Sequence, residues 1–285
     1  MLSIKNLSKE VIISICLKAS LFESDIFIPE NLNGKILVNV FFEPSTRTQL
    51  SFESAMYRLG GKVINFNKDV SSLNKGESFY DTIKTLKSYG DIFVIRHPDK
   101  GKVQEAKLIL NKHVINAGDG NGEHPTQAIL DFYTIYKRFN IPNDTLNILF
   151  VGDIKNSRTI HSLIYILIKF PNFKIFAFPY LNCELIDPII NNVDNIENLG
   201  FYDIIYYTRY QKERSNLENE YNIQEKYILN NKKLMTAKKS SIIMHPLPRN
   251  QEISTEVDKD TRCVYFEQVE NGLIVRMAIL DELFN

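Results

Sequence analysis

A β-strand that passes directly into a helix through a short polar turn is the most constraining feature of this sequence. Residues 35–40 form the run Lys-Ile-Leu-Val-Asn-Val, which is typical of a buried strand. Residues 52–59 place apolar side chains at helical spacing, and two glycines follow them. Pro44 and Ser45 stand between these segments and favour the start of a helix. The sequence therefore predicts strand, turn and helix in succession.

The start of this helix concentrates groups that bind anions. The backbone N–H groups of the first residues have no acceptor within a helix and lie at the positive end of its dipole. Ser45, Thr46, Arg47 and Thr48 add hydroxyl groups and a guanidinium at the same place. This combination favours a phosphate site. The alternative is an ordinary Ser/Thr cap of the helix beside a surface arginine.

Length and charge limit the possible functions. A chain of 285 residues is long for one hydrophobic core, so we expect two domains. The formal net charge is zero, with 34 basic and 34 acidic residues, which argues against a nucleic-acid partner. The apolar stretch at residues 11–17 is too short to span a membrane or to act as a leader. We therefore expect a cytoplasmic protein that is not bound to membranes.

Polar and cationic side chains follow further strand-like runs. Arg96 ends an apolar run, and a glycine-rich segment leads from the next strand to His124 and Gln127. Because ligands collect at the carboxyl ends of strands in open α/β sheets, we expect Arg96 beside the start of the Ser-Thr-Arg-Thr helix. Asp119 and His124 could also suggest a metal site, but no third ligand stands at suitable spacing.

A linker at residues 140–144 separates the two halves of the chain. It follows a helix at residues 125–139 that is long enough to bridge two domains. A strand-like run then ends at Gly152, but the triple-glycine fingerprint of dinucleotide binding is missing, so a nicotinamide cofactor is not expected. We predict an α/β protein of two domains, each a mostly parallel sheet flanked by helices, linked by interdomain helices.

The second half repeats the pattern of strands that end in cations. A strand is expected at residues 203–208, and Arg209 and Gln211 follow it. Short helices are expected near residues 183–192 and 232–239. The prolines of the segment His-Pro-Leu-Pro-Arg near the C-terminus predict a stiff turn with free carbonyl groups.

Three sequence blocks resemble those of one enzyme family. Residues 41–48 read Phe-x-Glu-x-Ser-Thr-Arg-Thr, which is similar to the signature of the carbamoyltransferases. These enzymes move the carbamoyl group of carbamoyl phosphate to the amino group of aspartate or ornithine. Residues 151–159 resemble the entry to the family's aspartate-binding domain. Residues 245–249, His-Pro-Leu-Pro-Arg, resemble the aspartate enzymes, since the ornithine enzymes carry cysteine in place of the first proline.

The resemblance runs nearly end to end and implies domains with separate substrates. Residues 1–139 would bind carbamoyl phosphate, and residues 140–265 would bind aspartate. The C-terminal helix, residues 266–285, would pack back on the first domain. The implied reaction gives N-carbamoyl-L-aspartate and phosphate, an early step of de novo pyrimidine biosynthesis.

The resemblance also implies roles for individual residues. The catalytic groups would be Thr48, Arg96 and His124. The carbamoyl phosphate site would comprise Ser45, Thr46, Arg47, Thr48, Ser72, Lys75, Arg96, His124, Gln127 and the backbone carbonyls of Pro246 and Leu247. The aspartate site would comprise Lys75, Arg158, Arg209 and Gln211. Glu43 would pair with Arg158 and Arg214 when the domains close.

The family also implies an assembly. Ser72 and Lys75 would enter the active site of a neighbouring subunit in a homotrimer, with Ser71 as the alternative to Ser72. Zinc-containing regulatory chains are possible partners, and neither a cofactor nor a metal ion in this chain is expected. Two other functions stay open. One is transfer to ornithine or another amino acid, and the other is a non-catalytic phosphate-binding regulatory module.

Overall fold

A computed structural model describes residues 1–24, 31–141, 143–180, 189–211 and 224–284. The chain forms two compact units. Unit 1 comprises Met1–Leu130 and Val269–Asn285, and unit 2 comprises Asp131–Gln268. The helices α5 (Pro125–Arg138) and α8 (Tyr265–Glu282) contain residues of both units and so link them along the chain. None of the helices in the described ranges is long and apolar enough to cross a membrane.

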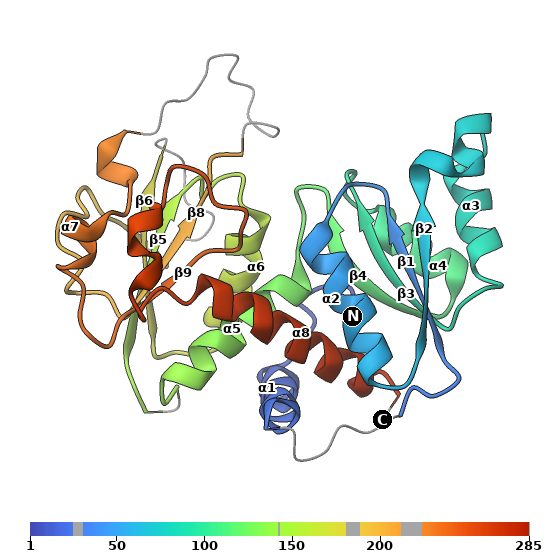
Figure 1. Ribbon diagram of the computed structural model, residues 1–285, viewed down its shortest axis with the longest axis horizontal. Helices are drawn as coiled ribbons and strands as arrows, with labels where there is room; N and C mark the ends of the chain where they lie inside the picture. Colours follow the sequence, from blue (N-terminus) through green and yellow to red (C-terminus); the bar gives the residue numbers. More distant parts are fainter. Residues whose placement is uncertain (25–30, 142, 181–188, 212–223, 285) are drawn as a thin grey trace. The chain divides into compact units, whose positions relative to one another are not determined.

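Unit 1 is built on a parallel sheet of four strands in the order β2-β1-β3-β4. The strands are β1 (Ile36–Phe41), β2 (Lys62–Asn67), β3 (Ile92–His97) and β4 (His113–Asp119). The helices of this unit are α1 (Lys9–Glu23), α2 (Thr46–Arg58), α3 (Phe79–Leu86) and α4 (Lys102–Leu110). Helices α3 and α4 cover one face of the sheet and α2 covers the other (Figure 1).

Successive side chains along each strand point to opposite faces of this sheet, and both faces are covered. Val38 and Val40 of β1 point to the same side, where they pack with residues of α3 and α4 such as Ile83 and Ala106. The neighbouring Leu37 of β1 is fully buried as well, which is the pattern of a parallel sheet covered by helices on both faces.

Strand register brings the residues at the ends of β1, β3 and β4, where the sequence predicts an anion site, to one edge of this sheet. Phe41 at the end of β1 lies opposite Arg96 of β3, and the N–H of Phe42 donates to the carbonyl of Arg96 over 2.9 Å. His97 pairs with Asp119 at the end of β4. The turns that follow all three strands therefore leave the sheet at its carboxyl edge, as predicted.

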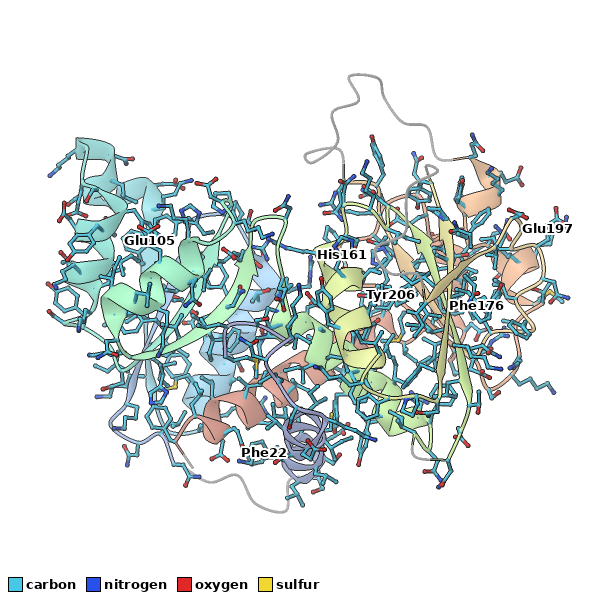
Figure 2. All side chains as sticks on the ribbon, turned by 180° about the vertical axis from the view of Figure 1, so that it is seen from behind. Phe22, Glu105, His161, Phe176, Glu197 and Tyr206 are labelled. Carbon is cyan, nitrogen blue, oxygen red and sulfur yellow. The ribbon has the colours of Figure 1, made fainter. Side chains whose placement is uncertain are left out.

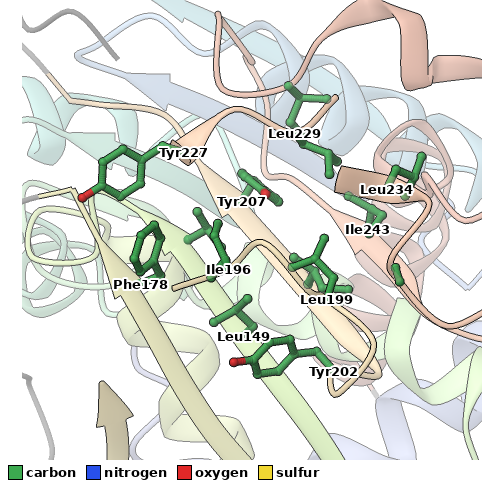
Figure 3. Packing of buried hydrophobic residues seen from close by; sticks show 14 of the residues in the cluster. Leu149, Phe178, Ile196, Leu199, Tyr202, Tyr207, Tyr227, Leu229, Leu234 and Ile243 are labelled. Atoms are coloured by element: carbon green, nitrogen blue, oxygen red, sulfur yellow. The ribbon is translucent and has the colours of Figure 1, made fainter. Parts of the chain in front are cut away.

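Unit 2 contains a parallel sheet of five strands in the order β7-β6-β5-β8-β9. The strands are β5 (Leu146–Gly152), β6 (Phe173–Pro179), β7 (Ile190–Asn192), β8 (Ile204–Thr208) and β9 (Ile242–Met244), and the helices include α6 (Arg158–Leu167) and α7 (Asn231–Leu234). On one face Leu149 and Tyr207 join a large apolar core (Figure 3). On the other face the rings of Phe150 and Tyr206 are 5.6 Å apart.

Two short helices of unit 2 differ from expectation. Residues 190–192 form β7 rather than the end of a helix, because their backbone pairs with the free edge of β6, and residues 181–188 lie outside the described part of the chain. The helix expected at 232–239 is only the single turn α7. The Thr236 hydroxyl donates to the carbonyl of Lys233 and accepts from the N–H of Leu199, which ties the chain to another segment instead of extending the helix.

Candidate active site

The start of α2 has no side-chain cap. Ser45 is the N-cap residue, but its hydroxyl makes no capping hydrogen bond to the helix. The N–H of Gln49 donates to the carbonyl of Ser45 over 3.1 Å, so the amides before Gln49 take no part in the helical ladder. Thr46 and Arg47 are exposed and Thr48 is buried. An uncapped helix start with hydroxyls and a guanidinium can hold a phosphate group.

Arg96 is fixed against this helix start. Its Nη1 donates to the Ser45 hydroxyl over 3.2 Å, and its Nε lies 2.6 Å from Oε1 of Glu43. The pairing of Glu43 with Arg158 and Arg214 is expected when the domains close and stays a prediction, and the structure also pairs Glu43 with Arg96 of its own unit. Arg214, one of the expected partners, lies outside the described residues.

His124 and Gln127 stand at the start of α5, where the loop after β4 ends. His124 is only 5% exposed, and its carbonyl accepts from the N–H of Gln127 over 3.2 Å. The loop is tight, since Gly120 has a φ of +56° and a Cβ there would lie 2.5 Å from the carbonyl oxygen of Pro98. His124 directly precedes α5 and Gln127 lies in its first turn, so both follow the loop that leaves the carboxyl end of β4, the strand beside β3 and Arg96.

Two carboxylates hold this loop, a role that the sequence did not indicate for either of them. Glu123 accepts from the hydroxyl of Ser3 over 2.6 Å and from the N–H of Ile4 over 2.7 Å. Asp119 accepts from the N–H of Gly101 with both oxygens. The two carboxylates contact segments that are separated from them in the sequence, so no local sequence pattern predicts these contacts. In the described ranges no group of three or more His, Cys, Asp or Glu side chains is placed to hold a metal ion.

The segment after β2 presents one of the two candidate serines. The hydroxyl of Ser71 donates to the carbonyl of Lys68 over 2.7 Å and is therefore occupied within its own turn. Ser72 and Lys75 lie on the next short 3₁₀ turn, and both are exposed. Gly76 ends that turn with a φ of +89°. The Nζ of Lys68 donates to the carbonyl of Phe42, which connects this segment to the turn before α2.

In unit 2 the carboxyl ends of β5 and β8 gather the predicted carboxylate-binding residues. Gly152 pairs with Thr208, and a Cβ at Gly152 would lie 2.1 Å from the carbonyl oxygen of Thr208. The two strand ends can approach this closely only because residue 152 is glycine. Arg158 opens α6 and is 5% exposed, and Ser157 caps that helix by accepting from the N–H of Ile160.

Asp153 links these two strand ends and was missed by sequence reasoning. One oxygen of its carboxylate accepts from the N–H of Gln211 over 3.0 Å, and the other accepts from the backbone and side chain of Asn156. Arg209 is half-buried, and its Nη1 donates to the carbonyl of Tyr210 over 3.1 Å. Arg209 and Gln211 therefore lie close together in sequence after β8, and the carboxylate of Asp153 after β5 holds the backbone of Gln211.

The His-Pro-Leu-Pro-Arg segment forms the predicted turn after β9. Leu247 has a φ of +49°, and the bond between Leu247 and Pro248 is cis. Arg249 forms an ion pair with Asp258 and lies over the ring of Tyr265. The hydrogen bond from Arg249 lowers the pKa of Asp258, so that carboxylate stays charged. Pro246 and Leu247 are half-buried at the end of the strand beside β8.

Comparison with known proteins decides the family. A sequence model described as the carbamoyl phosphate-binding domain of aspartate/ornithine carbamoyltransferase matches residues 1–137. A second, described as the aspartate/ornithine-binding domain of the same enzymes, matches residues 144–283. The chain belongs to the aspartate/ornithine carbamoyltransferase family. Within this family, the start of α2 and Arg96 fall in the first matched domain, and Arg158 and Arg209 fall in the second.

Individual carbamoyltransferases are similar over most of their length. The aspartate carbamoyltransferase catalytic subunit of Clostridium acetobutylicum is 45% identical over 88% of this chain and 86% of its own length. The crystal structure of Trypanosoma cruzi aspartate transcarbamoylase with carbamoyl phosphate has a TM-score of 0.91 at 36% identity, covering 98% of this chain and 94% of that chain. The structure of that enzyme with carbamoyl phosphate and aspartate has a TM-score of 0.90 at 36% identity and covers 98% and 95%.

Proposed function

We propose that this chain transfers the carbamoyl group of carbamoyl phosphate to the α-amino group of L-aspartate, giving N-carbamoyl-L-aspartate and phosphate in pyrimidine biosynthesis. The observation that carries the proposal is the open start of α2, where an uncapped helix end, Arg47 and a fixed Arg96 meet. The membership of the chain in the carbamoyltransferase family and its likeness to aspartate enzymes support it.

The phosphate of the donor binds at this helix start. Its negative oxygens meet backbone amides and the side chains of Ser45, Thr46, Arg47 and Thr48, and charge-assisted hydrogen bonds of this kind are the strong ones. Arg96, His124 and the Thr48 hydroxyl hydrogen-bond the carbamoyl oxygen. Gln127 and the backbone carbonyls of Pro246 and Leu247 accept from the carbamoyl NH₂ or the attacking amine.

Carbamoyl transfer needs the two substrates to be aligned and the negative charge of the intermediate to be stabilised, and it forms no covalent intermediate with the enzyme. The neutral amino group of aspartate attacks the carbamoyl carbon, and a tetrahedral intermediate forms with negative charge on the oxygen. The C–O bond to phosphate then breaks, and the departing phosphate takes the proton that the amine loses. One donor aimed at such an oxyanion is worth about 3 kcal/mol, and alignment of two bound reactants supplies about 7 to 11 kcal/mol.

The acceptor is recognised by its two carboxylates. Arg158, Arg209 and Gln211 provide donors at the carboxyl edge of the second sheet. An arginine fork matches a carboxylate in two hydrogen bonds, which a lysine cannot do. Ornithine has a cationic side chain, which these arginines would repel. Pro246 also distinguishes the His-Pro-Leu-Pro-Arg segment from that of the ornithine enzymes, which are expected to carry cysteine at this position.

The functional assembly is proposed to be a homotrimer with shared sites, in which Ser72 and Lys75 reach the site of a neighbour. Both residues are exposed on a turn of unit 1, and their side chains make no hydrogen bond or ion pair within the described residues. A lysine that contacts no acceptor in the described part of the chain is consistent with a role outside its own subunit. Glu43 and Arg214 are proposed to act when the donor and acceptor halves close on the substrates. We further propose a cytoplasmic location.

The activity is tested with purified protein, carbamoyl phosphate and either L-aspartate or L-ornithine. We expect N-carbamoyl-L-aspartate and one phosphate for each product molecule, and no carbamoyl ornithine. An Arg47→Ala protein purified in the same way controls for enzyme carried over from the host. Product from ornithine instead would assign the alternative acceptor. Binding of carbamoyl phosphate without product from either amino acid would favour the non-catalytic regulatory module.

The shared site is tested by mixing two impaired proteins. Lys75→Ala and Arg209→Ala each damage a different part of the site, so separately they should have little activity. Reversible dissociation and mixing should restore activity if each site takes Lys75 from one subunit and Arg209 from another, because some mixed sites hold both native residues. Sedimentation of the same samples reports the size of the assembly. Failure to recover activity in mixed trimers would place both residues in one subunit's own site.

A further inference from the structure

A buried polar pair stands directly behind the His-Pro-Leu-Pro-Arg turn. His245 and Glu252 have fully buried side chains, and Nε2 of His245 lies 2.9 Å from Oε1 of Glu252. The other ring nitrogen, Nδ1, lies 2.8 Å from the backbone nitrogen of Leu247. Because a backbone N–H can only donate, Nδ1 must accept, and the ring proton must be on Nε2, where it donates to the carboxylate.

This contact fixes the direction of a neighbouring carbonyl. The bond between Pro246 and Leu247 is trans, so the N–H of Leu247 and the carbonyl of Pro246 lie in one plane and point in opposite directions. With the N–H aimed at the imidazole, the Pro246 carbonyl must point away from it. The positive φ of Leu247 is unfavourable for a leucine and persists only where surrounding contacts hold it.

The backbone on the other side of His245 is held as well. Its N–H donates to Oε1 of Gln268 over 2.8 Å, and Nε2 of Gln268 donates to Asp131 over 2.8 Å. The second oxygen of Asp131 accepts from the hydroxyl of Tyr206, which Figure 2 labels, over 2.7 Å. These residues are buried and all belong to unit 2. Both the ring and the backbone of His245 are therefore anchored.

We infer that His245 is a positioning residue for carbamoyl transfer: its unprotonated Nδ1 holds the Pro246–Leu247 peptide so that the Pro246 carbonyl accepts from the reacting NH groups, while Glu252 holds the ring in the required tautomer. This inference rests on the proposed role of the Pro246 carbonyl. His245 itself touches no substrate. A carbonyl that swings out of line would misplace the reacting amine, and misplacement by about 1 Å can lower a rate about a hundredfold.

Two substitutions separate the two ring nitrogens. In His245→Asn the side-chain oxygen lies where Nδ1 was and can still accept from Leu247. In His245→Gln the amide nitrogen lies where Nε2 was and can still donate to Glu252, but no acceptor faces Leu247. We expect His245→Gln to lower kcat about a hundredfold with a small change in the KM for either substrate. His245→Asn should keep kcat within about fivefold, although it leaves Glu252 without its donor and lowers stability.

Each outcome decides the inference. Equal kcat in the His245→Asn and His245→Gln proteins, or a lower kcat in His245→Asn, would overturn it. If the role of His245 were purely structural, kcat would follow the stability of the two variants and not the presence of an acceptor at the Nδ1 position. If either protein fails to fold, ¹⁵N NMR of the unmodified enzyme decides instead: an unprotonated Nδ1 supports the inference and a protonated one contradicts it. Failure of the proposed function itself would appear separately, as absence of carbamoyl aspartate formation by the unmodified protein.

Discussion

Nε of Arg96 lies 2.6 Å from Oε1 of Glu43, so the cation at the end of β3 is held by the turn that opens α2. The same guanidinium donates to the Ser45 hydroxyl. Glu43 orients Arg96 and also balances its charge before substrate arrives. Glu43, Ser45 and Arg96 all belong to unit 1, so this part of the proposed carbamoyl phosphate site can be tested by single substitutions in that unit.

Glu43→Ala should lower kcat about tenfold, because Arg96 loses the partner that aims it at the carbamoyl oxygen. Steady-state kinetics at saturating carbamoyl phosphate and aspartate measure this change. Glu53→Ala is the control, since Glu53 is a carboxylate on α2, the helix that follows Glu43, and accepts from Asn65 instead of contacting Arg96. An unchanged kcat in Glu43→Ala would mean that Arg96 is held well enough without this carboxylate.

Arg47→Ala should weaken binding of carbamoyl phosphate by about tenfold to a hundredfold, the value of a charged hydrogen-bonding pair. Isothermal titration calorimetry with carbamoyl phosphate or phosphate measures the Kd. Arg58→Ala is the control, because Arg58 is exposed at the far end of the same helix. Equal weakening by both substitutions would point to net charge rather than a phosphate site at the helix start.

Arg209→Ala should raise the KM for aspartate at least tenfold and leave the Kd for phosphate almost unchanged, because Arg209 belongs to unit 2 and the proposed phosphate-binding residues at the start of α2 belong to unit 1. Kinetics with varied aspartate and a separate phosphate titration give the two values. Loss of both ligands to the same extent would contradict the division of substrates between the two units.

Gly152→Ala should destabilise the protein by more than about 2 kcal/mol. Gly152 has a φ of +125°, and a Cβ there would lie 2.1 Å from the carbonyl oxygen of Thr208. Gly34→Ala is the matched control, since Gly34 has a φ of +77° and a Cβ there would meet no atom within 4 Å. Urea unfolding should separate the two proteins, and similar losses would show that the β5–β8 approach tolerates a methyl group.

Stability should fall in acid because of His245. Burial lowers its pKa below the ordinary 6.5, so the unfolded chain binds a proton at a pH where the folded protein does not. The free energy of unfolding therefore decreases as pH falls from about 6.5 toward the lowered folded pKa, by at most about 1.4 kcal/mol per pH unit. Burial alone would raise the pKa of Glu252, but contact with His245 lowers it on balance, which adds a loss below 4.5.

The measurement compares unfolding at several pH values in the unmodified protein and in His245→Asn. Burial also lowers the pKa of His97 and of His113, and both contribute in the same direction, so the difference between the two proteins reports His245 together with its partner Glu252. We expect a shallower loss between pH 6.5 and 5 in the variant. Identical slopes would mean that His245 titrates alike in the folded and unfolded states.

The sequence by itself determined the local units. The strand, turn and helix around Ser45 and the turn after β9 follow from apolar periodicity, caps and prolines within a few residues. The strands that lead to Arg96 and Arg209 are predicted for the same reason, since their signals are local. The family likeness added roles to these residues and predicted the acceptor.

Tertiary structure decided everything that depends on distant partners. Residues 190–192 are a strand because the edge of β6 is available, and Glu43 pairs with Arg96 because strand register brings β1 and β3 side by side. The roles of Asp153 and of the His245–Glu252 pair likewise come from contacts across the fold. The physical reason is that backbone propensity acts over a few residues, whereas burial and pairing act between segments that only the folded chain brings together.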